Sequence, residues 1–411
     1  MHFTEFALHK DILKAVADSN YDEPTEIQKR AIPFILENRD VIASAQTGTG
    51  KTAAFALPIL SNLSQISDKS NKSKKIKSLV ISPTRELAVQ IQESFKTYGS
   101  YTDLKTTVVF GGTSLEPQIA ILKKGVDILV ATPGRLLDLH KRDVINLDYI
   151  ETFVVDEADL MLDMGFIDDV KKIERLCPED KQTLLFSATM PAKVVHLAQD
   201  ILKDPERVEV EAESSAAKTV EQKLYYVPKA KKIELCLHLL RNEIKGNILL
   251  FRRTKNGVDK LEETLTKNGF EVDTIHGDKS QSGRQAALNR FKKGEVNILI
   301  ATDVASRGLD IEDLDAVFNF DMPNIPETYV HRIGRTGRAG SEGISYSFCS
   351  ADEKEYVTII QKYIGRAIPV IEEHPYLLDP KVTPQVHKKK GSKYKKSRKG
   401  AGSKKNKKRW Y

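Results

Sequence analysis

The stretch that decides the fold is residues 40–63, "DVIASAQTGTGKTAAFALPILSNL". Its first six residues form a short apolar run that is typical of a buried strand, and the residues from Lys51 onward have the apolar content of a helix. A strand, a glycine-containing turn and a helix in this order surround a phosphate with backbone N–H groups and a helix N-terminus. The stretch therefore predicts a nucleotide-binding loop in an α/β fold.

The loop itself carries the side chains that nucleotide binding needs. Gly48 and Gly50 let the backbone turn tightly because they have no Cβ. Lys51 is expected to reach the β- and γ-phosphates, and the Thr52 hydroxyl can hold Mg²⁺. Ala45 stands where the strict pattern G-x-x-x-x-G-K-[ST] has Gly, which is tolerable if Ala45 keeps a negative φ. Because short patterns of this kind also occur by chance, a second site element is needed.

Residues 153–159, "FVVDEAD", supply that second element. An apolar strand ends here in Asp156, followed by Glu157, and a carboxylate at the end of a strand beside a phosphate loop is suited to hold a metal ion. Asp156 is predicted to bind Mg²⁺, directly or through water, and Glu157 to orient or deprotonate the attacking water. The alternative is a polar strand end that caps a helix. Together, the two elements favour an Mg²⁺-dependent nucleoside triphosphatase.

The organisation of the chain suggests two similar lobes. Apolar runs alternate with helical patterns such as residues 85–98, and strands that alternate with helices predict a parallel sheet with crossover helices. The predicted strands are 40–45, 79–82, 107–110, 128–131, 153–156 and 184–187 in the first block, and 248–251, 298–302, 316–320 and 344–348 in the second. The predicted divisions are a first lobe at 1–208, a linker at 209–218, a second lobe at 219–370 and a tail at 371–411.

Charge is distributed unevenly along the chain. Residues 381–411 hold 14 lysines and arginines and no acidic residue, whereas the first 380 residues hold 50 basic and 57 acidic residues. Such a tail is expected to be disordered and to bind RNA through its phosphates, although a solubilising role is the alternative. The three scattered cysteines match no metal-site or disulfide pattern, and no apolar run is long enough to cross a membrane. A cytoplasmic protein is therefore expected.

The second block has no phosphate loop but contains "HRIGRTGRAG" at residues 331–340. Arg332, Arg335 and Arg338 recur every third residue without acidic neighbours in the sequence, so their charges repel unless an anion lies between them. The functional interpretation is that arginines complete the nucleotide site from across a cleft. The alternatives are contacts to RNA phosphates or a solvated basic turn.

At this point the motifs resemble, in order, those of the DEAD-box ATP-dependent RNA helicases of superfamily 2. The resemblance covers roughly residues 3–370. The sequence "DEADLMLDMGF" at residues 156–166 is most similar to that of the bacterial RhlE-type branch. The motifs that carry it are "YDEPTEIQ" (21–28), "AQTGTGKT" (45–52), "PTREL" (83–87), "TPGR" (132–135), "DEAD" (156–159), "SAT" (187–189), "LLFRRT" (249–254), "QSGR" (281–284), "ATDVASRGLD" (301–310) and "HRIGRTGR" (331–338). The resemblance implies two tandem RecA-like lobes that use ATP and Mg²⁺.

The resemblance also implies a role for individual residues. Gln28 would read the adenine, Phe3 would stack on it, and Asp303 would contact the ribose or the phosphates. The remaining ATP-binding positions are Ala45, Gln46, Thr47, Gly48, Thr49, Gly50, Lys51 and Thr52. The catalytic set is Glu157, Lys51, Asp156 and the arginine fingers Arg335 and Arg338.

RNA contact and coupling residues follow from the same resemblance. The RNA path is implied at Pro83, Thr84, Arg85, Gly111, Gly112, Thr132, Pro133, Gly134, Arg135, Arg284 and Thr302. The residues that would couple hydrolysis to lobe movement are Asp159, Ser187, Thr189 and His331.

The expected activity is RNA-stimulated ATP hydrolysis coupled to local, non-processive unwinding of short RNA duplexes or to remodelling of RNA–protein particles. Two alternatives stay open: an ATP-gated RNA clamp and a DNA-directed helicase or translocase. The RNA would be bound through its backbone with little sequence preference. Ribosomal and degradosome particles are compatible partners, and a monomer is the default because the body lacks a heptad run.

Overall fold

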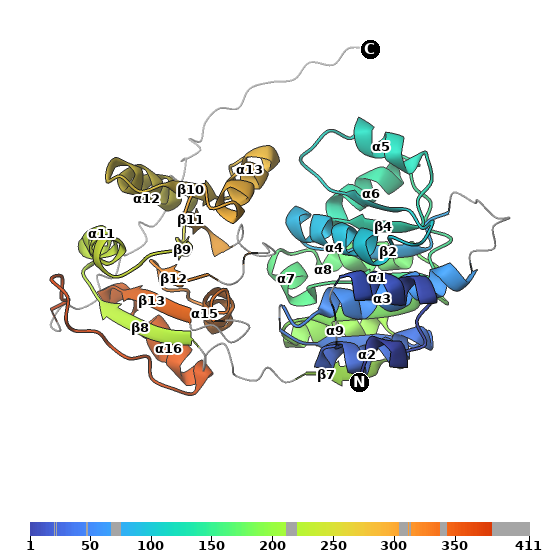
Figure 1. Ribbon diagram of the computed structural model, residues 1–411, viewed down its shortest axis with the longest axis horizontal. Coiled ribbons are helices and arrows are strands. Elements are labelled where there is room, and N and C mark those ends of the chain that lie inside the picture. The colour runs from blue at the N-terminus through green and yellow to red at the C-terminus, as the bar shows by residue number, and fades with distance from the viewer. Residues whose placement is uncertain are drawn as a thin grey trace, which may run out of the picture.

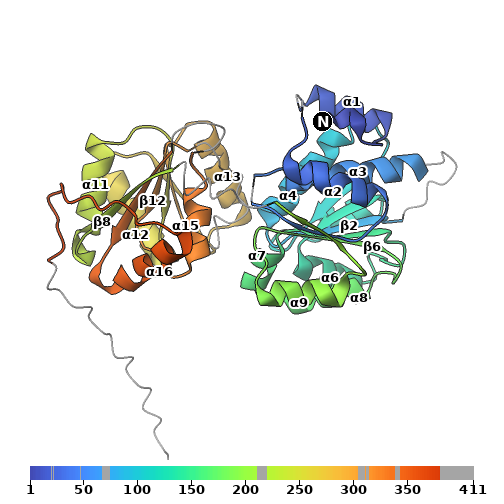
Figure 2. The same ribbon diagram turned by 90° about the horizontal axis from the view of Figure 1, so that it is seen from below.

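The computed structural model describes residues 1–19, 21, 23–46, 48–66, 75–210, 220–303, 311, 314–337 and 343–379. Within these residues the chain forms two α/β lobes, each built on one parallel sheet. The two lobes lie side by side, with the N-terminal lobe in blue and green and the C-terminal lobe in yellow and red (Figures 1 and 2). The predicted fold class is therefore confirmed.

The first sheet has seven strands among the described residues, in the order β3-β4-β2-β5-β6-β1-β7. All its pairings are parallel. Most of these strands read as continuous apolar runs because helices cover both faces of a parallel sheet. The strands are β1 (Val41–Ser44), β2 (Ser78–Ile81), β3 (Thr106–Val109), β4 (Ile128–Ala131), β5 (Thr152–Val155), β6 (Gln182–Ser187) and β7 (Glu206–Glu209).

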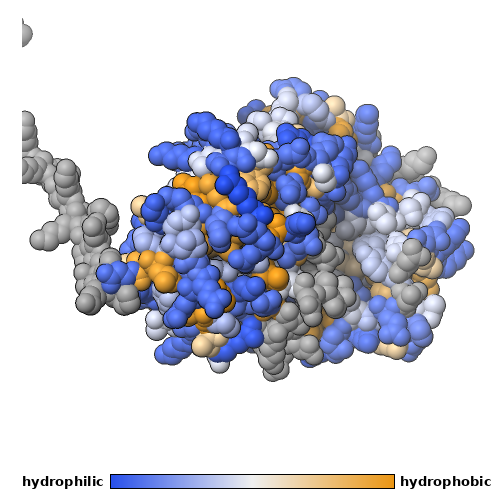
Figure 3. Space-filling view, turned by 60° about the vertical axis from the view of Figure 1, so that its left-hand side comes forward, coloured by the Kyte–Doolittle hydropathy of each residue, from blue (hydrophilic) through white to orange (hydrophobic). Residues whose placement is uncertain are grey.

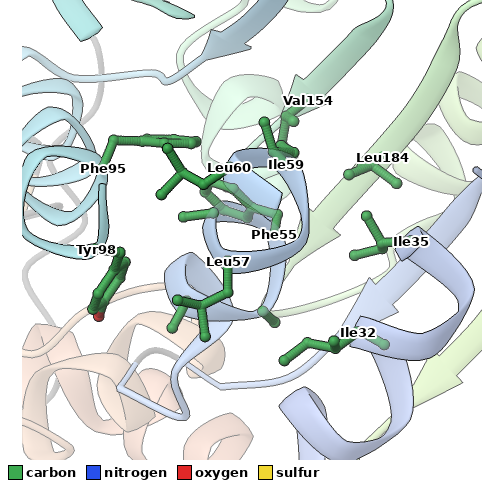
Figure 4. Close-up of a cluster of buried hydrophobic side chains, with 14 of the residues drawn as sticks. Ile32, Ile35, Phe55, Leu57, Ile59, Leu60, Phe95, Tyr98, Val154 and Leu184 are labelled. Carbon is green, nitrogen blue, oxygen red and sulfur yellow. The ribbon is translucent and has the colours of Figure 1, made fainter. Parts of the chain in front are cut away.

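Helices cover this sheet and enclose two buried hydrophobic clusters, one on each face. Figure 4 shows one cluster, in which Ile59 of α3 lies beside Val154 of β5 and Leu60 of α3 lies toward Phe95 of α4. This packing fixes α3 on the sheet and so fixes the loop that precedes it. The helices are η1 (Phe3–Glu5), α1 (Lys10–Asp18), α2 (Glu26–Leu36), α3 (Lys51–Ile66), α4 (Arg85–Tyr98), α5 (Glu116–Leu122), α6 (Pro133–Lys141), α7 (Ala158–Asp163), α8 (Ile167–Arg175) and α9 (Ala192–Ile201).

The second lobe repeats the architecture with a described six-stranded parallel sheet in the order β10-β11-β9-β12-β13-β8. Its strands are β8 (Val220–Tyr226), β9 (Ile248–Phe251), β10 (Val272–Ile275), β11 (Ile298–Ala301), β12 (Ala316–Asn319) and β13 (Gly343–Cys349). Its helices are η2 (Lys229–Lys231), α11 (Lys232–Asn242), α12 (Lys255–Lys267), α13 (Gln281–Lys292), α15 (Pro326–Ile333), η3 (Ala351–Glu353) and α16 (Lys354–Ile364).

Residues 366–379 form an ordered segment along the open edge of β8, although the predicted tail begins at residue 371. Within it, Ile371 donates a backbone hydrogen bond to Leu224, and Leu378 donates one to Tyr226. Ile371 and Tyr376 pack against a core cluster of the second lobe. These apolar side chains explain why residues 366–379 pack on the lobe. Residues 380–411, and with them the basic tail, lie outside the described residues.

Most of the predicted linker, at 211–218, also falls outside the described residues, as do residues 67–74 of the first lobe. Figure 3 brings the second lobe forward and shows a largely hydrophilic surface with local hydrophobic patches. No described helix combines the length and the apolar character that a membrane crossing requires.

Candidate nucleotide and RNA site

The phosphate loop has the backbone that its sequence predicts. Gly48 and Gly50 adopt φ values of 85° and 89°, in the region that favours glycine. Ala45 does not take a positive φ; it is buried, and its N–H donates to the carbonyl of Ser187 at 3.1 Å. The mismatch to the strict pattern is thus accommodated by a strand-like Ala beside β6. Thr47 lies outside the described residues.

Three buried charged side chains meet at the carboxyl ends of β1 and β5. The Nζ atom of Lys51 lies 2.9 Å from the Oε1 atom of Glu157, and both side chains are largely buried. Burial disfavours the charge on Lys51, but the carboxylates of Glu157 and Asp156 outweigh it, so that the pKa of Lys51 lies above its ordinary value. This balance keeps Lys51 a cation in a water-poor site.

The same burial and the neighbouring carboxylate change the pKa of Asp156. Burial, together with the charge of Glu157, raises the pKa of Asp156 to about 7. Its Oδ1 atom is buried and has no hydrogen-bond partner among the described residues. A buried carboxylate oxygen without a partner is suited to a cation. The described residues contain no cluster of three or more His, Cys, Asp or Glu side chains that would hold a metal without the nucleotide.

Glu157 has a strained backbone. Its φ and ψ are 51° and 57°, in the left-handed region, where a non-glycine residue is uncommon. The turn begins α7 immediately after β5 and brings the Glu157 side chain toward the phosphate loop instead of along the strand. Strain of this kind is commonly found at functional sites.

Three of the four predicted coupling residues, Asp159, Ser187 and Thr189, form one hydrogen-bonded cluster, and the fourth, His331, lies on the second lobe. The Oδ2 atom of Asp159 accepts from the backbone N–H and from the hydroxyl of Thr189, each at 2.9 Å. The Ser187 hydroxyl accepts from the N–H of Asp159 at 3.1 Å and donates to the carbonyl of Thr189 at 2.7 Å. The cluster ties the start of α7 to the end of β6.

Gln28, in α2, contacts the phosphate loop directly. Its Nε2 atom donates to the carbonyl of Gly50 at 3.1 Å, and its Oε1 atom accepts from the N–H of Thr25. Phe3 is buried in the core of the first lobe, with its ring centroid 6.1 Å from that of Phe6. The structure therefore holds the Phe3 ring in the core and leaves 5% of the residue exposed.

A cavity of about 260 Å³ lies between the two lobes. Glu157, Asp159 and Thr189 line it from the first lobe, and His331 and Arg335 line it from the second. The structure thus brings these sequence-predicted residues from both lobes to one place. Arg338, the second predicted finger, lies outside the described residues.

Arg332 pairs with a carboxylate in the fold, although residues 331–340 contain no acidic residue. It is buried, and its Nε and Nη2 atoms donate to the two carboxylate oxygens of Asp303 at 2.6 and 2.8 Å. Asp303 comes shortly after β11 in the sequence and lies beside α15 in the fold. Its contact with Arg332 joins residues that are 29 positions apart, so the local sequence does not show it. The side chain of Arg332 is therefore engaged inside the second lobe.

A groove of about 370 Å³ holds most of the predicted RNA contacts. Its first-lobe lining includes Pro83, Thr84, Arg85, Gly111, Thr132, Gly134 and Arg135, and Arg284 joins them from the second lobe. Sequence reasoning missed five further lining residues, which are Glu86, Met164, Phe166, Gly277 and Lys279. Their position within or next to quoted motifs is the signal that was available.

The groove concentrates positive charge. The pKa of Arg85 is lowered by its burial, and the neighbouring guanidinium groups of Arg284 and Arg135 lower it further against the opposing effect of Glu86. The Nη1 atom of Arg135 is buried and finds no hydrogen-bond partner in the described part of the chain. Mutual repulsion of this kind is relieved by an anion, so the groove suits a phosphate backbone.

Gly112 shapes this groove through its backbone. It has a φ of 77°, and a Cβ placed on it would lie 2.1 Å from the Nη2 atom of Arg85. A glycine at this position therefore lets the Arg85 guanidinium lie against the turn that follows β3. Thr302, which follows β11, is half-buried and donates its N–H to the carbonyl of Ile275 at 3.3 Å.

The two lobes also contact each other directly beside the groove. The Oε1 atom of Glu86, in α4, accepts from Gln281 at 3.0 Å and lies 3.1 Å from the Nη2 atom of Arg284. Arg85 in turn donates to the Oε1 atom of Gln281 at 3.3 Å. Glu86 and Gln281 belong to quoted motifs, but their pairing across lobes was not predicted, because it joins residues 195 positions apart.

Two family models match the chain. The model described as DEAD/DEAH box helicase matches residues 25–197, and the model described as helicase conserved C-terminal domain matches residues 231–340. The ATP-dependent RNA helicase CshA of Limosilactobacillus reuteri is 44% identical over 364 residues, which are 88% of this chain and 72% of the relative. The DEAD-box ATP-dependent RNA helicase RhpA of Helicobacter pylori is 41% identical over 370 residues, 90% of this chain and 74% of the relative.

A solved structure supports the same assignment. Dbp5 of S. cerevisiae, bound to RNA and ADP BeF3, is similar with a TM-score of 0.78 and 32% sequence identity, and the match covers 90% of this chain and 94% of that one. The order of motifs, the two parallel-sheet lobes and the extent of these matches agree. The chain belongs to the family of DEAD-box ATP-dependent RNA helicases.

Proposed function

We propose that this helicase couples ATP hydrolysis to local, non-processive opening of short RNA duplexes or to remodelling of RNA–protein particles. One observation carries the proposal: both the cavity that holds Glu157 and Arg335 and the groove that holds Arg85 and Arg284 are built from both lobes. Each ligand then favours the same closed arrangement. A closure that grips a single strand bends it locally and does not require movement along it.

In the proposed mechanism, water attacks the γ-phosphate in line with the leaving group, and catalysis is mostly positioning and electrostatics. Lys51 leaves its ion pair with Glu157 to contact the phosphates, which releases Glu157 to orient or deprotonate the water. Arg335, together with Arg338, stabilises negative charge that develops on the phosphoryl oxygens. The remaining loop residues and Gln28 position the nucleotide.

The residues present fit a bound Mg²⁺. Asp156 has a buried oxygen without a hydrogen-bond partner among the described residues, and burial raises its pKa. A divalent cation would bind that oxygen and stabilise the charged carboxylate. Thr52 offers a hydroxyl at the start of α3. A bound Mg²⁺ would neutralise charge on the β- and γ-phosphates. Asp156 and Thr52 would hold it together with phosphate oxygens.

We propose that RNA is bound through sugar and phosphate, since the groove offers guanidinium groups and glycine-containing turns. Such contacts carry little sequence information. The coupling cluster of Asp159, Ser187 and Thr189 would transmit lobe closure to the catalytic carboxylates, because it joins α7 to β6 directly behind them.

The test is strand separation of a short duplex with an RNA or a DNA loading strand, measured with ATP and with a non-hydrolysable analogue, alongside ATPase rates. The proposal expects RNA-stimulated hydrolysis and RNA strand separation that requires ATP. Equal stimulation by DNA would support a DNA-directed translocase instead. RNA-stimulated hydrolysis without strand separation would support an ATP-gated clamp.

The wider assignments rest on sequence. We propose a first lobe at 1–208, a linker at 209–218 and a second lobe at 219–370. The ordered segment extends the second lobe to residue 379, and a basic RNA-binding tail follows.

The RhlE-type branch is proposed from the sequence of residues 156–166. A monomer is proposed because the body lacks a heptad run, and a cytoplasmic location because the three cysteines are free and buried. Ribosomal and degradosome particles are compatible targets.

A further inference from the structure

The cavity between the lobes has an apolar side that the proposed chemistry does not use. Four apolar residues line it from the first lobe and one from the second, and these are Leu87, Leu160, Leu162, Pro191 and Ile325. Their side chains offer neither a hydrogen bond nor a charge to a phosphate or to Mg²⁺. None of the described phosphate-loop residues, 45, 46 and 48–52, lines the cavity. The apolar side therefore needs an explanation other than contact with the nucleotide phosphates.

Ile325 is the apolar residue that the second lobe contributes. It is 44% exposed, and it belongs to none of the hydrophobic clusters that the described residues of this lobe form. Its backbone is extended, with φ of −112° and ψ of 121°, and Pro326 follows it as the first residue of α15. A residue before a proline is disfavoured in the helical region, so the local sequence holds Ile325 outside the helix.

The wall that the first lobe contributes is also incompletely buried. Leu160 and Leu162 of α7 and Leu87 of α4 are half-buried. In both ribbon views α7 faces α15 across the junction of the lobes (Figures 1 and 2). A single exposed apolar residue is ordinary on a protein surface. Here, however, apolar side chains of both lobes line the same cavity.

The helix α15 links Ile325 mechanically to Arg335. Ile325 lies just before the helix and Arg335 just after it, and both line the cavity. The helix is about 12 Å long, and Tyr329 and Ile333 anchor it in the core of the second lobe with no exposed surface. A lobe movement that brings Arg335 toward Glu157 therefore carries Ile325 along. Apolar surfaces that approach each other across the cavity lose water, which stabilises the closed arrangement.

We propose that Ile325 is a positioning residue, which stabilises the closed arrangement of the lobes by packing against Leu160 and Leu162 when ATP and RNA are bound. The inference rests on the proposed function in one respect, that both ligands favour lobe closure. The competing explanation is that Ile325 only shapes the N-terminus of α15. A role of that kind would change stability or the affinity for one ligand alone. A contact made on closure changes how strongly each ligand enhances the binding of the other.

The experiment measures binding of a non-hydrolysable ATP analogue to the full chain, with and without a short single-stranded RNA. The ratio of the two affinities is the enhancement factor. The variants are Ile325→Ala, Ile325→Leu, which keeps the apolar surface, and Ile359→Ala as a matched control. Ile359 lies in α16 of the same lobe and is 43% exposed, but it does not line the cavity. Thermal unfolding of each variant reports on stability.

Ile325→Ala should reduce the enhancement factor by about fivefold, the effect of burying roughly half of an Ile side chain. The melting temperature and the affinity for each ligand alone should stay near those of the wild type. Ile325→Leu and Ile359→Ala should keep the wild-type factor. An equal reduction by Ile359→Ala, or a wild-type factor in Ile325→Ala, would overturn the inference. So would a loss of stability or of single-ligand affinity in Ile325→Ala without a change in the factor.

The wild type separates this inference from the proposed function. If the wild type shows no enhancement, the two ligands do not share a closing step, and the proposed function fails together with the inference. If the wild type shows enhancement and Ile325→Ala keeps it, only the inference fails.

A second set of variants tests the partner of Ile325 on the first lobe. Leu160→Ala is compared with the double variant that carries Ile325→Ala as well. If the two side chains meet on closure, the double variant should lose less of the enhancement factor than the product of the two single losses. Losses that multiply would show that the two side chains do not meet, and this would overturn the assigned contact.

Discussion

At Glu157 a left-handed backbone and a buried ion pair with Lys51 coincide. The backbone geometry aims a carboxylate at the phosphate loop, and the ion pair places it against the buried Lys51 ammonium. We expect Glu157→Gln to bind ATP and RNA nearly as the wild type does, because Gln has the same shape and keeps a polar contact to Lys51. Hydrolysis should fall by about 10²–10⁴-fold, the usual contribution of a general base.

Single-turnover hydrolysis at saturating RNA measures the chemical step of this variant, and binding of a fluorescent nucleotide measures its affinity. Near-normal hydrolysis with intact binding would remove Glu157 as the catalytic carboxylate. Loss of binding together with hydrolysis would instead indicate that the ion pair with Lys51 shapes the phosphate loop.

Asp156 leads to a prediction about pH in protein free of nucleotide and metal. Its pKa is raised to about 7 by burial and by Glu157, far above the ordinary value for Asp. Between pH ~4 and ~7 the folded state therefore holds a proton that the unfolded state has released, so this group makes stability fall as pH rises through that window. Asp156→Asn should flatten this part of the profile, as measured by thermal unfolding at pH 5 and pH 7. An unchanged profile would contradict a raised pKa at Asp156.

Among the structural elements, the turn after β3 offers a matched pair of glycines. A Cβ at Gly112 would lie 2.1 Å from the Arg85 guanidinium at a φ of 77°, whereas a Cβ at Gly111 would meet nothing within 4 Å. Gly112→Ala should displace Arg85 and raise the RNA concentration for half-maximal ATPase stimulation by about tenfold, the effect of removing one charged hydrogen bond. Gly111→Ala, which leaves Arg85 in place, should raise it by less than Gly112→Ala does. Equal effects of the two substitutions would show that the turn, and not Arg85, matters.

The elements also show what the sequence could predict. Continuous apolar runs such as residues 128–131 and 248–251 became central strands, because a strand that is buried on both faces must be apolar throughout. The pattern missed β7, β8 and β10, which lie at sheet edges or at the lobe boundary and carry polar residues. For β8, "VEQKLYY", polar side chains alternate with buried ones and resemble a linker.

The site residues also divide into those that the local sequence predicts and those whose contacts form only between distant segments. The phosphate loop and Asp156 were predictable because a short strand-turn-helix context fixes their geometry. The pairing of Arg332 with Asp303 and that of Glu86 with Arg284 were not, because each joins segments that meet only in the folded chain. Spacing within "HRIGRTGR" suggested three equivalent arginines, and burial distinguishes Arg332 from Arg335 among the described residues.

The segment along β8 predicts that two truncations will differ. A chain that ends at Asp379 keeps the backbone hydrogen bonds to Leu224 and Tyr226, whereas a chain that ends at Val370 lacks the packing of Ile371 and Tyr376 against the core. The shorter chain should lose about 3 kcal/mol of stability and unfold several degrees earlier, as calorimetry would show. Equal melting temperatures of the two truncations would mean that the segment adds nothing to the second lobe.

At the scale of the whole molecule, the chain that ends at Asp379 tests the basic tail separately. It should keep the RNA-independent ATPase rate of the full chain but require more RNA for half-maximal stimulation, most clearly at low salt. Each RNA phosphate that the tail no longer neutralises should reduce the slope of log K against log salt by roughly 0.7–0.9. Identical RNA titrations at every salt concentration would leave the tail without a role in RNA binding.

The two lobes meet at Glu86, whose carboxylate contacts Gln281 and Arg284 of the other lobe beside the RNA groove. If ATP and RNA each favour lobe closure, then by thermodynamic linkage each must strengthen the binding of the other by the same factor. Glu86 is buried, so Glu86→Gln keeps its shape and a hydrogen bond but removes the charge that holds Arg284 across the interface. We expect this variant to weaken the mutual enhancement by roughly threefold, with similar affinities for each ligand alone.

The enhancement factor can be measured in two independent ways. One is binding of a non-hydrolysable ATP analogue with and without RNA, and the other is binding of RNA with and without the analogue. Unequal factors would show that the two ligands do not act on one shared equilibrium, and an unchanged factor in Glu86→Gln would place the coupling elsewhere in the interface.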